Sequence, residues 1–434
     1  MTTPTERSNQ STADPSTAAR VVAARNAVAA VFFLNGLAVA SWFARIPAAK
    51  EALDLPNGKF GLVLLGLSAG AVLAMVTAGA TASRLGTRQV VAAATVLLAI
   101  GLVVAGIGTG LLNSVPVTVV GLLAVGYGSG TCDVAMNVEA AMVERRLGRT
   151  VMPRFHAAWS IGTVTGAAIG AGASHLGTPI GVSLPTIAVL VLIGTLVAVR
   201  SFLPAALIAE SAGADGSEAA FEPGADSPAP SRRSAALSAW MEPRTLLIGL
   251  LVLVMAFTEG SANDWVAVAF VDGYRVSEAG GAAVFGVFVA AMTLGRTVGT
   301  IALDRWGRVR VLIATMLLAA AGATIAVLAG SLAVAVIGVA LWGLGASLGF
   351  PVGMSAAADD ESRAAVRVSV VALIGYTAFL AGPPLVGLLG DHVGILRALL
   401  VVPVLLIPAL ALVPVSRPPA ARTRAAEPAG QQAE

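Results

Sequence analysis

The stretch TIALDRWGRV (residues 300–309) has a counterpart 221 residues earlier in the chain, GATASRLGTR (residues 79–88). Each stretch directly follows the second long apolar segment of its half of the chain and carries a glycine beside basic residues. Weak internal symmetry of this kind is typical of membrane proteins built from two related halves. The two stretches therefore predict a duplicated architecture.

A second pair of features repeats at nearly the same spacing. Asn35 and Trp42 in the first apolar segment correspond to Glu259 and Trp265 in the seventh, at offsets of 224 and 223 residues. The shared offset predicts that the first and seventh segments occupy equivalent places in the two halves.

Twelve apolar segments surround these repeats, and most are long enough to cross a bilayer as helices. A spanning helix needs about 20 residues at a rise of about 1.5 Å per residue. The runs are too long, and alternate too little, for the strands of a β-barrel. The predicted spans are 26–44, 59–81, 89–110, 115–141, 155–175, 181–203, 245–271, 280–302, 310–329, 332–356, 367–389 and 394–415.

The composition agrees with a membrane protein. Of the 434 residues, 57% are hydrophobic and only 12% are charged, whereas a soluble chain carries about 25% charged residues. Basic residues do not alternate with aromatics on a polar face, so no nucleic-acid partner is expected. The single cysteine, Cys132, excludes an intrachain disulfide and a CxxC metal site. We therefore expect an all-α integral membrane protein of twelve helices.

The central part of the chain interrupts the apolar pattern. It is rich in Ala, Ser, Gly and Pro, a composition typical of flexible linkers. The predicted regions are an N-terminal tail (1–25), a six-helix bundle (26–203), a linker (204–244), a second six-helix bundle (245–415) and a C-terminal tail (416–434).

The distribution of Lys and Arg predicts the orientation. If the N-terminus is cytoplasmic, the cytoplasmic segments hold 21 of the 27 basic residues and the opposite side holds five. The remaining one, Arg296, lies within a span. The positive-inside rule then places both termini in the cytoplasm. The expected location is the bacterial cytoplasmic membrane.

The loop after the eighth segment resembles the signature of the major facilitator superfamily, G-x-x-x-D-R-x-G-R-[RK]. The matching residues are Asp304, Arg305, Gly307 and Arg308, while Thr300 replaces the leading glycine. The resemblance extends over residues 26–415 and implies two pseudo-symmetric six-helix bundles. In that family the loop closes the cytoplasmic gate through charge contacts between helix ends.

The first-half copy of the loop keeps Gly79, Arg84, Gly86 and Arg88, but Ser83 stands where the family has an aspartate. The resemblance implies that these residues also belong to the cytoplasmic gate. A tight basic turn required only by topology is the alternative for both loops.

Within the superfamily, GTCDVAMNVEAA (residues 130–141) is similar to the fourth helix of the fucose permease-like branch of sugar–proton symporters. That branch carries an acid followed four residues later by Asn, and Asp133 and Asn137 match those positions. The branch's second acid, late in the first helix, has no counterpart here, since Phe43 occupies its place. The resemblance implies a sugar-like solute and coupling to protons.

Asp133 is the first candidate for the coupling residue. An ionised carboxylate at the centre of a membrane helix costs about 2.5–3.5 kcal/mol on insertion scales, so such acids are usually functional. Asp133, Asn137 and Glu144 share one helix face at 100° per residue. We expect Asp133 to accept a proton, with Asn137 binding solute hydroxyls or holding the carboxyl. A structural hydrogen bond to a neighbouring helix is the alternative.

The seventh segment supplies the other polar cluster, TEGSANDW (residues 258–265). Glu259 lies near its centre and Asp264 nearer the outer end, and we expect both to take part in proton coupling. Asn263 is a candidate for solute binding. Arg296, in the eighth segment, is the expected counter-ion of one of the two acids, in a pair that is either permanent or broken during transport.

The remaining candidates are a histidine, the aromatic residues and one amide. His156 titrates near neutral pH and could relay protons, although a lone histidine at a membrane interface is often structural. Trp42 and Trp265 lie near outer helix ends, where an aromatic belt is the alternative. The expected solute contacts are Asn35, Trp42, Trp159, Trp265 and Tyr376.

These features predict a secondary active transporter, not an enzyme, which moves a small polar solute by alternating access. We expect no cofactor, a proton gradient as energy source, and a monomer in the lipid bilayer. Proton-driven drug or metabolite efflux is the nearest alternative, and Na⁺ could use the same carboxylates. A receptor would need a signalling module. An enzyme would need a nucleophile–base or metal constellation, to which three histidines on three segments give little support.

Overall fold

The computed structural model describes residues 15–149, 151–203, 239–360 and 363–417. Within these ranges the chain folds into helices and contains no strand. The first half comprises α1 (Pro15–Phe43), α2 (Ile46–Leu53), α3 (Asn57–Leu85), α4 (Thr87–Gly110), α5 (Val115–Leu147), α6 (Met152–His175), α7 (Ile180–Ala198) and the 3-10 turn η1 (Val199–Ser201).

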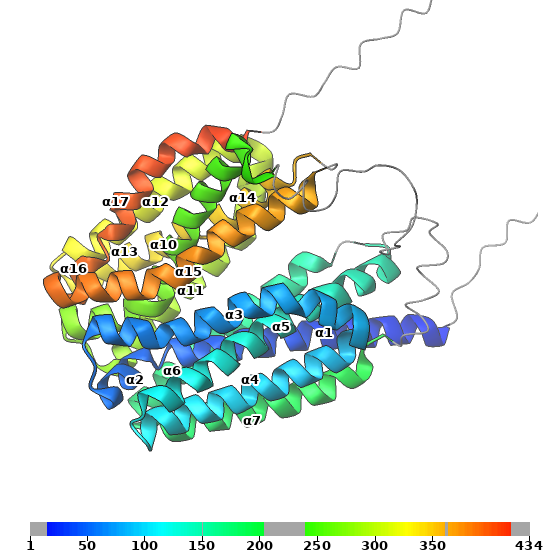
Figure 1. Cartoon of the computed structure of the whole chain (residues 1–434), viewed down its shortest axis with the longest axis horizontal. Coiled ribbons are helices and arrows are strands. Elements are labelled where there is room, and N and C mark those ends of the chain that lie inside the picture. Colours follow the sequence, from blue (N-terminus) through cyan, green and yellow to red (C-terminus); the bar gives the residue numbers. More distant parts are fainter. Residues whose placement is uncertain (1–14, 150, 204–238, 361–362, 418–434) are drawn as a thin grey trace, which may run out of the picture.

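The second half repeats this order without a counterpart of α2. Its elements are α10 (Pro243–Tyr274), α11 (Glu278–Trp306), α12 (Arg308–Leu328), α13 (Leu332–Ala346), α14 (Gly349–Ala357), α15 (Ala364–Val393), α16 (Ile395–Ala398), α17 (Val401–Ala409) and the 3-10 helix η2 (Leu410–Ser416). The two halves lie side by side as separate groups of helices in Figure 1.

Eleven helices of the described chain are long and apolar enough to cross a membrane. The twelfth crossing is α6, which is 24 residues long but is not among the eleven most apolar helices. Since α5 and α7 both run toward the same end of the bundle, the intervening α6 must cross in the opposite direction. The chain is therefore a multi-pass membrane protein, and its described residues make twelve crossings, as the sequence predicts.

The two ends of the helical bundle carry different elements. The linker end is where η1 ends and α10 begins, and the α2 end is the opposite one, which carries α2. Contacts between the halves are made mainly by α3 with α15 and by α6 with α11. These four helices therefore form the walls of the space between the two halves.

The repeated loops adopt the same conformation in both halves. Gly86 separates α3 from α4 with a φ of 81°, and Gly307 separates α11 from α12 with a φ of 78°. This backbone region is sterically disfavoured for residues with a Cβ. The glycines therefore allow each pair of helices to reverse direction within one residue, which confirms the symmetry inferred from the two stretches.

Several predicted boundaries are wrong in detail. Helix α1 begins at Pro15 and its candidate membrane span at Ala19, both inside the predicted N-terminal tail, and α10 begins at Pro243, inside the predicted linker. The span predicted over 332–356 is broken at Ser347, and the one over 394–415 is split into α16, α17 and η2. Polar residues can continue a helix beyond the apolar core of the bilayer, which the apolar pattern alone does not report. Residues 1–14, 204–238 and 418–434 of the predicted tails and linker lie outside the described part.

Close helix packing in the first half depends on small residues. A Cβ on Gly162 of α6 would collide with the carbonyl oxygen of Phe33 in α1. Gly172 lies on the same helix, but nothing lies within 4 Å of the position where its Cβ would be. We therefore expect Gly162→Val to destabilise the protein by about 1–3 kcal/mol, as other overpacked positions do. The thermal unfolding temperature in detergent should fall by several degrees for Gly162→Val and stay unchanged for the control Gly172→Val. Equal effects of both variants would contradict this packing.

Candidate functional site: a cavity between the two halves

A cavity of about 850 Å³ lies between the halves and reaches the linker end. One wall is the first turns of α6, including His156 and Trp159, and the other is α11 with Arg296. The cavity continues past Asp304 to Arg308, the loop that joins α11 to α12. It thus connects predicted solute-binding residues with predicted gate residues in one space that is accessible from one end.

Arg296 forms the main ion pair inside the helical bundle. Its Nη2 lies 3.0 Å from both carboxylate oxygens of Glu259 on α10. The two side chains are 29% and 15% exposed, so both charges are largely withdrawn from solvent. Of the two predicted acids, the structure therefore pairs Arg296 with Glu259 rather than with Asp264.

The break between α13 and α14 supplies a further contact for Arg296. Its Nε donates to the carbonyl oxygen of Ser347 at 3.4 Å. In a continuous helix this carbonyl would accept from the residue four positions later, but that residue is Pro351, which has no N–H. The proline thus leaves a backbone acceptor free to hold the guanidinium against Glu259.

Asp133 lies half-buried on α5, and its nearest polar partner is on the same helix. Asn137 Nδ2 donates to the backbone carbonyl of Asp133 at 2.8 Å and to Oδ1 at 3.3 Å. No ion pair with Asp133 occurs among the described residues. Of the two predicted roles for Asn137, this geometry corresponds to holding the carboxyl. The Tyr376 hydroxyl of the other half lies within electrostatic range of Asp133.

Asn35 and Asp264 occupy different environments. Asn35 is buried and accepts a hydrogen bond from Ser129 of α5 at 3.1 Å, so it fastens α1 to α5. Asp264 is half-buried, and no ion pair or hydrogen bond to its carboxylate occurs in the part of the chain that the structure describes. Asn263 beside it is also half-buried. The cavity wall at the linker end includes none of these three residues.

The tryptophans fall into two groups. Trp159 lines the cavity. Trp42 and Trp265 are completely buried, and their indole N–H groups have no hydrogen-bond partner. The aromatic-belt alternative for these two residues is therefore wrong, because a belt residue must reach the membrane interface. Trp265 packs edge-on against Phe60 of the other half, with ring centroids 6.2 Å apart, so it closes the site at the α2 end.

Two further candidates connect elements around the cavity. The Tyr376 hydroxyl of α15 lies 3.7 Å from the Met75 sulfur of α3, a contact between the halves. The His156 ring meets Phe32 edge-on at 5.3 Å, and His156 lies within electrostatic range of Arg296. The histidine thus faces the guanidinium across the cavity.

The α2 end is closed by direct contacts between the halves. Lys50 of α2 forms an ion pair of 2.7 Å with Asp272, and the Gly58 N–H donates to Asp391 at 2.9 Å. A Cβ on Gly61 would lie 2.5 Å from the carbonyl oxygen of Pro383, so α3 and α15 touch through their backbones. Among the described residues, the space between the halves thus opens toward the linker end and is closed by contacts between the halves at the α2 end.

The predicted gate residues make contacts within the second half. Arg308 Nη1 lies 2.9 Å from Asp359, two residues after the end of α14, and Arg244 binds the same carboxylate at 2.9 Å. Asp304 and Arg305 take part in no ion pair between described residues, and the same holds for Arg84 and Arg88. In this open form the loops therefore make no charge contact across the halves.

Sequence reasoning missed two acids that fix the linker end. Asp359 is the shared partner of Arg244 and Arg308, and its distance in sequence from both gives no signal. Glu139 is fully buried and accepts hydrogen bonds from the Thr87 hydroxyl at 2.5 Å and the Leu203 N–H at 2.9 Å. Glu139 thus joins α4, α5 and the end of η1.

Glu242, just before α10, gives a pH-dependent contribution to stability. Burial opposes its ionisation, but hydrogen bonds from Arg367 and Thr245 and the charges of Arg367 and Arg363 outweigh burial and lower the pKa of Glu242. A lowered pKa stabilises the fold above the ordinary value of about 4.3, and this contribution is lost as pH falls through the lowered value. The melting temperature of the unmodified protein should exceed that of Glu242→Gln at pH 7, and the difference should shrink below about pH 5. A difference that grows on acidification would contradict the assignment.

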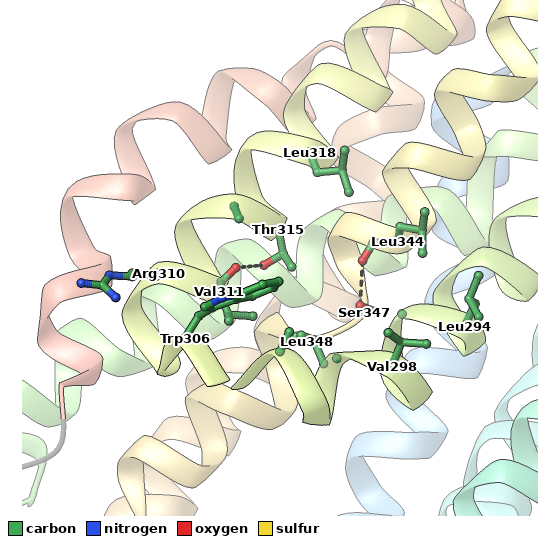
Figure 2. Close-up of a pocket in the computed structure, with 14 residues that line it drawn as sticks. Leu294, Val298, Trp306, Arg310, Val311, Thr315, Leu318, Leu344, Ser347 and Leu348 are labelled. Carbon is green, nitrogen blue, oxygen red and sulfur yellow. Dashed lines mark hydrogen bonds between the residues drawn. The ribbon is translucent and has the colours of Figure 1, made fainter. Parts of the chain in front are cut away.

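A second cavity, of about 520 Å³, lies on the surface of the second half between α11, α12 and α13 (Figure 2). Leu294, Val298 and Trp306 at its rim are more than half exposed. The Thr315 hydroxyl bonds to the carbonyl oxygen of Val311 and the Ser347 hydroxyl to that of Leu344, as the dashed lines show. The remaining charged residue of the lining, Arg310, points away from the other lining side chains in Figure 2, so the groove presents a mainly apolar surface.

Comparisons with known proteins agree on the family. The sequence profile of the Major Facilitator Superfamily matches residues 251–433. An uncharacterised transporter of that superfamily from Yersinia pestis is 33% identical over 364 residues, which are 83% of this chain and 87% of the relative. The nucleoside transporter NupG superposes with a TM-score of 0.70 at 14% identity, covering 89% of this chain and 98% of NupG. The E. coli fucose:proton symporter FucP gives 0.59 at 14% identity, covering 91% and 98%.

Proposed function

Because the chain belongs to the Major Facilitator Superfamily, we propose that it carries a small polar solute across the bacterial cytoplasmic membrane by alternating access, coupled to protons. The observation that carries this proposal is the Arg296–Glu259 ion pair, placed at the wall of a cavity of about 850 Å³ between the halves. A desolvated ion pair is expensive to keep unless a bound ligand or proton uses it.

The chemistry of the cavity favours a hydrophilic solute. Arg296 donates one nitrogen to Glu259 and one to a backbone carbonyl, which leaves Nη1 available to a solute oxygen. Trp159 offers an aromatic face and His156 a ring nitrogen. Sugars and nucleosides match this lining, because their hydroxyl groups can bond to Arg296 and His156 and their apolar face can pack against Trp159. The names of two structural neighbours, a nucleoside transporter and a fucose:proton symporter, make these solutes the first to test.

The orientation follows from the basic residues. The linker end carries most of the arginines, so we place it, with both termini, in the cytoplasm. The cavity then opens inward, and the α2 end is the closed outer side. The protein acts as a monomer in the bilayer without a cofactor. Asp133 and Glu259 are the proton acceptors and His156 assists them. Asn137 holds the Asp133 carboxyl, and Trp159 and Tyr376 help to bind the solute.

A thermal-shift screen of the purified protein tests solute binding. The panel contains monosaccharides, polyols, nucleosides, amino acids and drug-like cations. A sugar or nucleoside should raise the melting temperature of the unmodified protein and have no effect on Arg296→Gln. Stabilisation by cationic drugs alone would instead support the efflux alternative and contradict a polar solute.

A further inference from the structure

Two acids from different halves meet at the α2 end. Glu51 of α2 and Glu278, the first residue of α11, lie within hydrogen-bonding reach of one another, and both line the small cavities at this end. An ionised carboxylate can only accept hydrogen bonds, so the two groups can bond directly only if one of them holds a proton. We call these two residues the carboxyl pair.

A buried arginine stands beside the carboxyl pair. Arg45 is 3% exposed and lines the same cavity of about 660 Å³. Its Nη1 donates to Ser174 at 2.6 Å and its Nη2 to the carbonyl oxygen of Thr178 at 2.8 Å. Its Nε is buried without a partner, and Glu278 attracts its charge. Arg45 is thus a fixed cation of the first half with a donor left over for a carboxylate.

Four other charged or titratable groups face this region. Lys50 and Asp272 form their ion pair across the halves. Asp54 lines the cavity of about 280 Å³ that also contains both members of the carboxyl pair. His175 lines the larger cavity beside Arg45. A pH response caused by the carboxyl pair must therefore be distinguished from one caused by His175.

We propose that Glu51 and Glu278 form a proton-binding site that holds the α2 end closed, and that loss of this proton favours opening of that end. The proposal rests on the proposed alternating access, but not on the identity of the solute. The carboxyl pair bridges the halves, so it exists only while the α2 end is closed. The closed form therefore holds a proton that the open form releases, and raising the pH must shift the equilibrium toward the open form.

Distances between the halves measure this shift directly. Cys132 is the only cysteine, so a Cys132→Ala background with Leu112→Cys and Leu328→Cys carries one spin label at the α2 end of each half. Both leucines are more than half exposed. As pH rises from 5 to 8 in lipid nanodiscs, the population with the longer distance should grow. One linked proton changes the ratio of open to closed molecules by up to about tenfold per pH unit.

Two substitutions separate the carboxyl pair from its neighbours. In Glu51→Gln the amide can donate to Glu278 at every pH, so the pH response should disappear with the α2 end closed. Glu278→Gln is the reciprocal variant and should behave alike. His175→Gln should keep the unmodified response, and Asp272→Asn should raise the open population at every pH without changing the slope.

A pH response that survives in both Glu51→Gln and Glu278→Gln would overturn the proposal, as would its loss in His175→Gln. The measurement needs no solute. A failure of proton-driven uptake combined with an intact pH response would therefore contradict the proposed function and leave the carboxyl pair in place.

Discussion

Arg296→Gln is expected to lower proton-driven solute uptake by about tenfold or more, since breaking one side of a largely desolvated ion pair leaves the other charge unpaired. Glu259 would lose its cation at 3.0 Å, and the cavity would lose the ion pair that connects its wall to that acid. Uptake into proteoliposomes under an imposed pH gradient measures the loss, with protein incorporation checked for each variant.

The matched control is Thr300→Ala. Thr300 lines the same cavity on the same helix, but its hydroxyl bonds only to the carbonyl oxygen of Thr297 within α11. Uptake should stay within about twofold of the unmodified protein, because an exposed helical hydroxyl contributes little. The exchanged pair Glu259→Arg with Arg296→Glu should restore folding stability. Normal uptake by Arg296→Gln would show that transport does not require this ion pair.

Asp133→Asn is expected to separate transport from proton coupling. The amide keeps the size of the side chain and can still meet Asn137, but it cannot take up a proton. Each tenfold accumulation of solute needs about 1.4 kcal/mol, which the proton gradient supplies through the coupling residue. Without that coupling, accumulation of solute against its gradient should fall at least about tenfold. Exchange of labelled for unlabelled solute, which needs no net proton movement, should persist.

Glu139→Gln is the control for Asp133→Asn. Both acids lie on α5, but Glu139 is fully buried and already satisfied by Thr87 and Leu203. Its replacement should lower the melting temperature, since a buried hydrogen-bonded carboxylate is replaced by a weaker acceptor. The ratio of accumulation to exchange should not change. A lower ratio in Glu139→Gln and a normal one in Asp133→Asn would reverse the roles of the two acids.

The fold could be predicted because long apolar runs in a membrane allow few alternatives. The backbone must satisfy its own hydrogen bonds, so each run becomes a helix, and the glycines at 86 and 307 mark equivalent turns. The break at Ser347 was missed, although Pro351 is a local signal for it. The true ends of α1 and α10 were missed because helices continue into polar surroundings where hydropathy carries no information.

The site could be predicted only in part. The sequence offered Arg296 two acids, and Glu259 and Asp264 lie about 140° apart around α10 at 100° per residue. Which of them faces α11 depends on how the helices rotate against each other, and that is set by tertiary packing. The carboxyl pair was missed because Glu51 and Glu278 lie at the ends of apolar segments in different halves, where isolated acids are ordinary.

Proton movement caused by solute addition tests the central claim most directly. Proteoliposomes containing a trapped pH indicator and no pH gradient receive the solute identified by thermal shift on the outside. Coupled uptake predicts that the lumen becomes acidic, and that Asp133→Asn abolishes this change while exchange continues. Alkalinisation of the lumen would show antiport instead, and solute entry without any pH change would contradict proton coupling.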